Sequence, residues 1–545
     1  MKKSERIKSL KDLFSVSYGI RIPNYQRSYS WEVKHCIQFL DDLVEQNGKD
    51  YYLGQLLFEV ENEMLYIIDG QQRLTTSIIL ISTLARRLRE LELDVSEIES
   101  LYLSDKFHTI RDDQVLFKKC TRRHIAPKAI DLETLSQKRI IEAYNYFYDT
   151  LPRDKESLYN ILSSLQGSLI INFYVNSKAE ATQIFEYQNN RGKDLSQFEV
   201  IKAYLMHQIY IHAESKSYAS SAISDIESMV SKIYRNMEAT EGYFSEVELL
   251  NITCDLNWNV KGNVSDVKDK LSKVTEKLDW VTVFFEKMEE ITDNARSLVL
   301  SKRIPLVSNL FLLGNEVDWK FVLIAIYNRA ETDTLEFELI LKSLEMLCFK
   351  MKLGDFRTDY LARYTKAYFS GGSDINELYG EIKKAALYGF KGYWNNDSKF
   401  KNIIINFFEK QNHHYDRNVI KFVLWQYENK LRTVNRSGVL LDKFLYDEYT
   451  IEHIAPQTPS DVKYSDEFEK NYLHRAGNLA LLTKSQNSKF NNKPFKYKKA
   501  LFQDTALSSY TEIRGNEKWT ESEISNRHES ILNFIKDYFD SNRIE

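Results

Sequence analysis

The sequence predicts an α+β protein that is predominantly helical and contains more than one domain. Its 545 residues are too many for a single hydrophobic core, so we expect two to four domains. Only 18 glycines and 7 prolines are present, which argues against a sheet-dominated chain and against long disordered linkers. From about residue 216 to residue 370, apolar residues recur at three- and four-residue spacing, the pattern of packed helices.

The first predicted domain, residues 1–215, mixes strands and helices. The segments 51–60 (YYLGQLLFEV) and 63–70 (EMLYIIDG) are predicted as short strands, and 167–175 (GSLIINFYV) as a further buried strand. The segment 74–93 (LTTSIILISTLARRLRELEL) is predicted as a helix with one apolar and one arginine-rich face. These elements indicate an α/β domain.

Two further regions complete the predicted organisation. Residues 216–400 are predicted as a helical connecting region, in which we recognise no functional motif. Residues 401–545 are predicted as the last domain. From residue 440 onward it carries three of the seven prolines, a Lys- and Asn-rich stretch and a final amphipathic helix.

The composition indicates a soluble, cytoplasmic protein with no membrane partner. The formal net charge of −4 gives no global positive field, so any nucleic-acid-binding surface must be local. The four cysteines are far apart and form no CxxC pair, which excludes a zinc knuckle of the usual spacing and predicts reduced thiols. The N-terminus lacks an apolar signal core, and the longest apolar stretch is too short to span a membrane.

The tetrapeptide HIAP occurs twice, at His124 and at His453, and only the second copy has a promising context. EYTIEHI and NLALLT are predicted as short strands, and KSQNSKF as the start of a helix. Two strands and a helix around Glu452, His453 and Asn487 can hold one metal ion. Arg123 precedes the first copy and no comparable pattern follows it, so we expect His124 to have a structural or surface role.

These residue types suit phosphodiester hydrolysis. A neutral imidazole such as that of His453 can take a proton from water near neutral pH. The carboxylate of Glu452 and the amide of Asn487 supply the oxygen atoms that hard divalent cations prefer. Asn478, just before the second strand, is suited to tie the long loop so that His453 points correctly.

The segment resembles the His-Asn-His (HNH, ββα-metal) nuclease motif, in the variant whose third position is Asn. Glu452 and His453 match the acidic–His pair, Asn478 matches the middle Asn, and Asn487 matches the metal-binding position. The resemblance implies that His453 is the general base and that Glu452 and Asn487 bind Mg²⁺ or Mn²⁺. The sequence departs from many HNH enzymes in having Glu where they have Asp, so the longer side chain must fold back to reach a metal ion.

A lysine run follows the motif. Residues 484–499 contain six lysines and no acidic residue, with aromatic residues interleaved. Beside the HNH residues we interpret this run as a surface that contacts DNA phosphates, the alternative being a solvated surface. The lysines assigned to DNA are Lys484, Lys489, Lys493 and Lys496.

A second polar cluster, DGQQR, lies in the first domain. A predicted strand ends at Asp69, Gly70 makes a tight turn, and a helix is predicted to begin near Leu74. Free backbone N–H groups at a helix start, with Arg73 beside them, can bind phosphate. Asp69 can hold a metal or orient water, and Gln71 and Gln72 can read a base or a sugar. The alternative is a turn that only joins a strand to a helix.

Two other stretches accompany DGQQR. The first, IPNYQRSYSW, contains Gln26 and Arg27, and the second, NNRGKDLS, contains Asn189 and Arg191 and precedes a helix with Lys202. Together the three resemble the N-terminal domain of GmrSD-type restriction proteins, a ParB-like, nucleotide-hydrolysing fold that this family pairs with a C-terminal HNH domain. The resemblance covers about residues 1–215 and 415–545.

The resemblance implies a nucleotide-regulated DNA endonuclease of bacterial anti-phage defence whose cleavage depends on modification of the DNA. The first domain would bind and hydrolyse a nucleoside triphosphate of unknown identity through Gln26, Arg27, Asp69–Arg73, Asn189 and Arg191. Alternatives are a non-catalytic sensor or regulator, and a toxin-like nuclease that acts on unmodified nucleic acid. Double-strand cleavage by a single HNH site would favour a homodimer.

Overall fold

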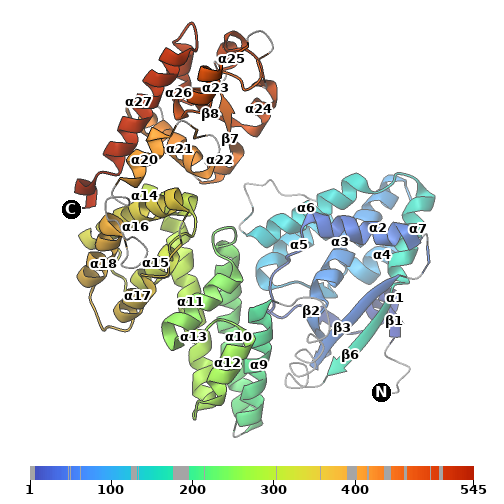
Figure 1. Cartoon of the computed structure of the whole chain (residues 1–545). Coiled ribbons are helices and arrows are strands. Elements are labelled where there is room, and N and C mark those ends of the chain that lie inside the picture. The colour runs from blue at the N-terminus through green and yellow to red at the C-terminus, as the bar shows by residue number, and fades with distance from the viewer. Residues whose placement is uncertain are drawn as a thin grey trace. The chain divides into compact units, whose positions relative to one another are not determined.

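The computed structural model of the chain describes most of its residues and divides into two compact units, Met1–Arg296 and Ser297–Glu545. The described residues are 7–46, 48–49, 51–61, 63–123, 132, 134–175, 196–213, 215–301, 304–355, 357–389, 402–410, 412–413, 417–434, 443–459, 463–490, 492–502 and 507–544. Helices predominate in both units, so the predicted α+β, mainly helical fold class is confirmed (Figure 1). The boundaries predicted at residues 215 and 400 differ from this division and stay predictions.

The first unit contains a mixed six-stranded sheet in the order β1-β6-β3-β4-β2-β5. Its strands are β1 (Ile7–Ser9), β2 (Gly19–Arg21), β3 (Tyr52–Glu61), β4 (Met64–Asp69), β5 (Phe107–His108) and β6 (Leu169–Val175). β3 pairs antiparallel with β4 and parallel with β6. The three strands predicted from the sequence are therefore its three central neighbours β6, β3 and β4.

Helices pack against one face of this sheet and form the main core of the unit. They are α1 (Leu10–Ser15), α2 (Val33–Gln46), α3 (Gln71–Glu90), α4 (Ser96–Ile98), α5 (Arg111–Arg123), α6 (Leu135–Thr150) and α7 (Lys155–Gln166). On the other face, Leu57, Ile68 and Val175 of the sheet meet Ala203 of α9 (Gln197–His212). β3 is central and is buried over most of its length because both faces are covered.

Helix α3 departs from the sequence prediction in two ways. It begins at Gln71 rather than near Leu74, because Gly70 adopts a left-handed conformation (φ 91°) that ends β4 and starts the helix at once. The predicted arginine-rich face does not simply face solvent. The guanidinium groups of Arg86 and Arg87 lie 3.9 and 3.8 Å from the ring centre of Tyr148 of α6, and Arg87 is buried.

The rest of the first unit is helical. Its elements are α10 (Lys216–Ala239), α11 (Glu246–Trp258), α12 (Val264–Ser272) and most of α13 (Lys277–Leu300). The predicted helical connecting region therefore starts inside the first unit, where α9 contacts α10, α11 and α12.

The second unit joins the remaining middle helices to the C-terminal elements. They are α14 (Pro305–Leu313), α15 (Trp319–Asn328), α16 (Leu335–Gly354), α17 (Ala362–Phe369), α18 (Ile375–Tyr388), α20 (Ile403–Glu409), α21 (Arg417–Val434), α22 (Lys443–Glu448), β7 (Tyr449–His453), α23 (Asp466–Asn471), η5 (Ala476–Asn478), β8 (Leu479–Thr483), α24 (Lys484–Phe490), α25 (Phe495–Leu501), α26 (Ser509–Arg514), α27 (Glu521–Tyr538) and η7 (Ser541–Ile544). Among the described residues, no helix is both long and apolar enough to cross a membrane.

A buried polar network explains why α16 belongs with the C-terminal elements. The side chain of Glu345 on α16 is fully buried and lies 2.9 Å from the guanidinium of Arg543 in η7. Its other oxygen accepts hydrogen bonds from Asn309 Nδ2 of α14 (2.6 Å) and from Tyr538 Oη of α27 (2.8 Å). Removing one member of such a network would leave a buried charge or polar group unpaired, so the network holds these helices together.

Candidate functional site

Two strands and a helix form the frame of the C-terminal site. β7 and β8 pair antiparallel, with Glu452 opposite Ala480 and His453 opposite Leu479. α24 follows β8 directly. The strand–strand–helix arrangement predicted around the second HIAP copy is therefore confirmed as secondary structure.

A pocket of about 630 Å³ opens beside this frame. The residues lining it are Thr450, Glu452, His453, Gln457, Lys484, Asn487 and Asn492. The predicted general base, both predicted metal ligands and one predicted DNA-contacting lysine thus share one cavity. Their chemical roles stay predictions.

Asn478 lies outside the lining and holds the loop between the two strands. It is fully buried. Its Oδ1 accepts hydrogen bonds from the backbone N–H of Ala455 (2.8 Å) and from the indole of Trp519 (3.0 Å). Its Nδ2 donates to the carbonyl oxygens of Ala455 (3.2 Å) and Leu473 (2.7 Å). Because Ala455 is two residues after His453, these contacts fix the chain next to the predicted base.

Helix α27 supports the same loop from behind. Nη1 of the buried Arg527 donates to the carbonyl oxygens of Gly477 (2.9 Å) and Leu479 (2.7 Å). Gly477 itself touches the helix backbone, since a Cβ atom at this position would lie 2.0 Å from the carbonyl oxygen of Ile524. Only glycine therefore lets α27 approach Asn478 this closely.

His474 is a partner of His453 that the sequence did not predict. Nε2 of His453 lies 3.0 Å from Nδ1 of His474, so one of these two nitrogens carries the shared proton. The backbone carbonyl of His474 accepts a hydrogen bond from the backbone N–H of His413 (2.9 Å). Burial lowers the pKa of His474, opposed by the nearby Glu469. In the sequence, the one indication of this partner was a histidine four residues before Asn478.

Lys498 of α25 is the second unpredicted partner. Its side chain is fully buried, and its Nζ lies 2.6 Å from Oε1 of Glu452 and donates to the carbonyl oxygen of His453 at 2.6 Å. Burial raises the pKa of Glu452, and Lys498 opposes that shift. Burial lowers the pKa of Lys498, and Glu452 opposes it in turn. In the sequence, Lys498 was indistinguishable from the other lysines of the run.

The donor groups of the pocket fit a hard divalent cation with a small set of protein ligands. Nδ2 of Asn487 donates to Oγ1 of Thr450 (3.1 Å), which leaves the amide oxygen as its cation-binding atom. Glu452 adds a carboxylate. Among the described residues, no group of three or more His, Cys, Asp or Glu side chains is placed to hold a metal ion. A site with one carboxylate and one amide oxygen is typical for Mg²⁺, which usually binds one or two protein ligands together with water and substrate phosphate.

The four lysines assigned to DNA all have exposed side chains. Lys484 and Lys489 belong to α24, Lys493 lies between the helices, and Lys496 belongs to α25. Exposure is what phosphate contacts require, and DNA contact itself stays a prediction.

In the first unit, the DGQQR turn joins β4 to α3. Asp69 is the last residue of β4, and Gly70 caps the helix with φ 91°. A Cβ atom on Gly70 would lie 2.1 Å from Cδ2 of Leu56, so the turn requires glycine for space as well as for conformation. Burial raises the pKa of Asp69, and Arg73 opposes the shift.

Arg73 binds the neighbouring strand. Its Nη1 and Nη2 donate to the backbone carbonyl oxygens of Leu53 (2.8 Å) and Gln55 (2.9 Å) of β3. Between them, Gly54 lies so close that a Cβ atom would be 1.7 Å from Nη1 of Arg73. The guanidinium therefore ties α3 to β3, and a phosphate contact by Arg73 stays a prediction.

The two glutamines of DGQQR also make contacts inside the fold. Gln72 accepts a hydrogen bond from the backbone N–H of Ser30 (2.8 Å) and donates to the carbonyl of Ser28 (3.0 Å). Nε2 of Gln71 lies 3.4 Å from Oε1 of Gln26. All three glutamines are buried. The DGQQR and IPNYQRSYSW stretches are thus brought together, and nucleotide binding by them stays a prediction.

Arg27, a predicted nucleotide-binding residue, has a partly accessible side chain. It is 41% exposed, and its Nε lies 3.3 Å from Oε1 of Glu199. Glu199 is the third residue of α9 and forms a capping box with Ser196. Sequence reasoning missed Glu199, whose signal was the Ser-x-x-Glu pattern at the helix start.

Lys202, one turn further along α9, is buried beside the same group. Its Nζ donates to the carbonyl of Tyr25 (3.4 Å) and to Oη of Tyr234 on α10 (3.2 Å). Burial lowers its pKa to about 8, against the opposing effect of Glu199. The stretch around Gln26 and Arg27 is therefore fastened to α9 and α10.

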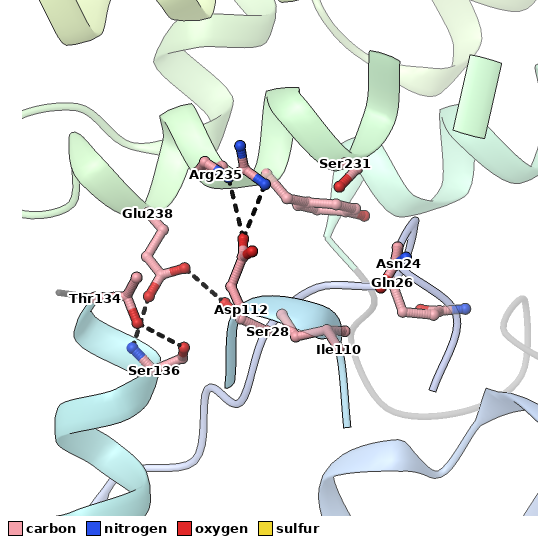
Figure 2. A pocket seen from close by; sticks show the side chains of 11 residues that line it. Asn24, Gln26, Ser28, Ile110, Asp112, Thr134, Ser136, Ser231, Arg235 and Glu238 are labelled. Atoms are coloured by element: carbon pink, nitrogen blue, oxygen red, sulfur yellow. Dashed lines mark hydrogen bonds and ion pairs between the residues drawn. The ribbon is translucent and has the colours of Figure 1, made fainter. Parts of the chain in front are cut away.

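A second pocket, of about 140 Å³, lies beside Gln26 (Figure 2). Its lining residues are Asn24, Gln26, Ser28, Ile110, Asp112, Thr134, Ser136, Ser231, Tyr234, Arg235 and Glu238. Figure 2 shows Arg235 and Glu238 extending from α10 toward Asp112 and Ser136. Of these described lining residues, Gln26 was predicted to bind nucleotide. The lining residues from α10 were not predicted, because no sequence motif marks them.

Three predicted positions lie outside the described residues. They are Asn189 and Arg191 of the NNRGKDLS stretch and His124 of the first HIAP copy.

Comparison with protein families gives two matches. Residues 10–206 match the family model of the GmrSD restriction endonuclease N-terminal domain, and residues 394–534 match that of the GmrSD restriction endonuclease C-terminal domain. The first match contains DGQQR, and the second contains the pocket around Glu452 and His453. Comparison with curated protein sequences finds no match.

Proposed function

The chain belongs to the GmrSD family of restriction endonucleases, which supports a DNA endonuclease in phage restriction, and we propose that it hydrolyses DNA at the pocket of Glu452, His453 and Asn487. We further propose that cleavage depends on a divalent cation, is regulated by a nucleotide in the first unit, and is directed to modified DNA. The observation that carries the proposal is the meeting of these three side chains in one cavity on a ββα frame.

His453 acts as the general base in this proposal. Its imidazole accepts the proton of the water that attacks the phosphate. His474 holds the ring in one orientation, as the second partner of a catalytic histidine often does. Asn478 holds the loop that follows His453, so the base keeps its position during turnover.

Glu452 and Asn487 are the residues that would hold the cation. A bound Mg²⁺ or Mn²⁺ would neutralise charge on the phosphate and on the leaving oxygen. The exposed Lys484, Lys489, Lys493 and Lys496 would contact neighbouring phosphates without reading sequence.

For the first unit, we propose that the DGQQR turn and Arg27 bind a nucleoside triphosphate. The start of α3 offers backbone N–H groups, and the accessible Arg27 offers a positive charge. Asp69, Gln71, Gln72 and Arg73 shape this turn, together with Gln26. Lys202 and Tyr234 connect the neighbouring segment to α10, so nucleotide binding can change the position of α10.

A cleavage assay tests this function. Plain plasmid and DNAs carrying glucosylated, methylated or phosphorothioate groups are incubated with Mg²⁺ or Mn²⁺, with and without nucleoside triphosphates. We compare wild type, His453→Ala and the control His212→Ala, whose exposed histidine ends α9. We expect wild type and control to cut at least one DNA and His453→Ala to lose about 100-fold or more of the rate.

The outcomes separate the alternatives. A wild-type chain that binds DNA or nucleotide but cuts nothing would be a sensor or regulator. Equal cutting of every DNA, without any effect of nucleotide, would indicate a toxin-like nuclease. Cutting by His453→Ala at the wild-type rate would move the active site elsewhere. Nicks that become double-strand breaks only at higher protein concentration would support a homodimer.

A further inference from the structure

The carboxylate of Glu452 already has a positively charged partner inside the protein. Lys498 places its ammonium 2.6 Å from Oε1 of Glu452, and its side chain has no exposed surface. A lysine so deeply buried cannot reach DNA, so it differs in kind from the exposed lysines of the same run. Its second contact, to the carbonyl oxygen of His453, holds it against β7.

The charged side chains among the described lining residues, taken together with Lys498, carry a net positive charge. Of the lining residues that the structure describes, Glu452 alone carries a carboxylate, and Lys484 carries an ammonium. Lys498 adds a second positive charge in direct contact with Glu452. In the described part of the chain, no group of three or more His, Cys, Asp or Glu side chains is placed to hold a metal ion.

This balance opposes the entry of a divalent cation. An ion bound to the second oxygen of Glu452 would sit a few ångströms from Nζ of Lys498, where two positive charges repel strongly because little water separates them. Lys498 also stabilises Glu452 without any ion, so a cation gains less from binding there. A DNA phosphate in the pocket cancels this positive excess, since it adds a negative charge, and it also supplies oxygen ligands.

We propose that Lys498 is a resident counter-cation that keeps the divalent-ion affinity of the free protein low, so that the ion binds together with the DNA phosphate. The inference rests on the proposed function, because it uses the same cation site. Coupling is reciprocal: if DNA tightens ion binding, the ion tightens DNA binding by the same factor. The free protein would then remain without its ion until DNA arrives.

Equilibrium binding of Mn²⁺, followed by electron paramagnetic resonance, tests the proposal. The intact chain carries His453→Ala to prevent cleavage, and the duplex is one that the wild-type chain cleaves. We expect the duplex to lower the Mn²⁺ dissociation constant of this protein by about tenfold or more. Adding Lys498→Met should lower the dissociation constant without duplex by about tenfold and reduce the effect of the duplex.

Controls assign the signal to this site. The duplex alone is titrated first, because DNA itself binds Mn²⁺, and Glu452→Gln should remove the protein-dependent part. Lys536→Met, at an exposed lysine of α27, should leave Mn²⁺ binding unchanged. If Lys498→Met fails to fold in a thermal melt, the duplex dependence of the protein that keeps Lys498 still decides the question.

The inference is overturned if the free protein binds Mn²⁺ as tightly as the DNA complex does. It is equally overturned if a folded Lys498→Met protein binds Mn²⁺ no more tightly than its parent. Both results are distinct from failure of the proposed function, in which the wild-type chain cuts no DNA under any condition.

Discussion

The motif residues of the two units are used differently. In the second unit, Glu452, His453 and Asn487 line one cavity. In the first unit, Gln72 and Arg73 make their hydrogen bonds to backbone groups of Ser28, Ser30, Leu53 and Gln55. Polar motif residues at a strand and a helix thus line a pocket in one unit and brace a turn in the other.

The difference teaches where a substitution will act. Except for Glu452, which pairs with the buried Lys498, a side chain that meets mainly water or ligand in a cavity can be removed with little effect on folding. A side chain that satisfies buried backbone groups cannot, since its loss leaves those groups without hydrogen bonds. Stability and activity measured side by side can therefore tell the two uses apart.

The largest effect is expected for Asn478→Ala. The change leaves the N–H of Ala455, the indole of Trp519 and the carbonyl of Leu473 without their partner. We expect the free energy of unfolding to fall by about 4 kcal/mol and cleavage to fall by about 100-fold or more. Urea denaturation and the cleavage assay measure the two quantities, with Asn526→Ala at an exposed position of α27 as the control. Near-normal cleavage would show that His453 needs no fixed loop.

The next effect contrasts the two arginines of the first unit. Arg73→Ala should lower the free energy of unfolding by about 3 kcal/mol, because two carbonyl oxygens of β3 lose their donors. Arg27→Ala should lower it by only about 0.5 kcal/mol, since that ion pair is partly exposed, yet it should reduce nucleotide turnover. Urea denaturation and phosphate release measure the pair. Equal stability of the two variants would refute the bracing role of Arg73.

A smaller effect concerns pH in the second unit. Burial lowers the pKa of both His413 and His528 to about 4. Because an unfolded imidazole takes up its proton near pH ~6.5, the unfolded state binds more protons between pH ~6.5 and ~4, and stability falls as the pH falls through this range. Each imidazole should contribute a loss of about 1.5 kcal/mol between pH ~6.5 and ~5.

The variant His528→Leu isolates this contribution. It removes one of the two protonations, so its unfolding free energy in urea should change less with pH than that of wild type. Comparing slopes cancels the constant cost of the substitution and the effects of distant groups. Identical slopes would mean that His528 is protonated equally in the folded and unfolded states.

The smallest effects are expected at the exposed lysines. Lys489→Ala, Lys493→Ala and Lys496→Ala should each reduce the slope of log affinity against log salt by about 0.9, since each removes one phosphate contact. Fluorescence anisotropy with duplex DNA at several salt concentrations measures the slope, and Lys536→Ala serves as the control. A slope that stays constant in all three variants would show that these lysines do not contact DNA and form a solvated surface.

Much of the C-terminal site was predictable because its signals are local. The strand containing Glu452, the strand that follows Asn478 and the helix containing Asn487 each show in a few consecutive residues, and the hydrogen bond of Asn478 to Ala455 ties the loop. Lys498 was not predictable, because its burial depends on how α25 packs against β7. The bracing role of Arg73 was likewise not predictable, because it depends on how α3 packs against β3. Gly54, which leaves room for the guanidinium, can be interpreted only once the structure is known.

The close contact between Gly477 and α27 has a consequence for the order in which the protein is made. Ile524 and Arg527 are translated well after His453 and Asn478, yet they form the wall against which the Asn478 loop is fixed. A nascent chain on the ribosome that ends before α27 contains every pocket residue but not this wall. We therefore expect the pocket to reach its final geometry only after α27 has been synthesised.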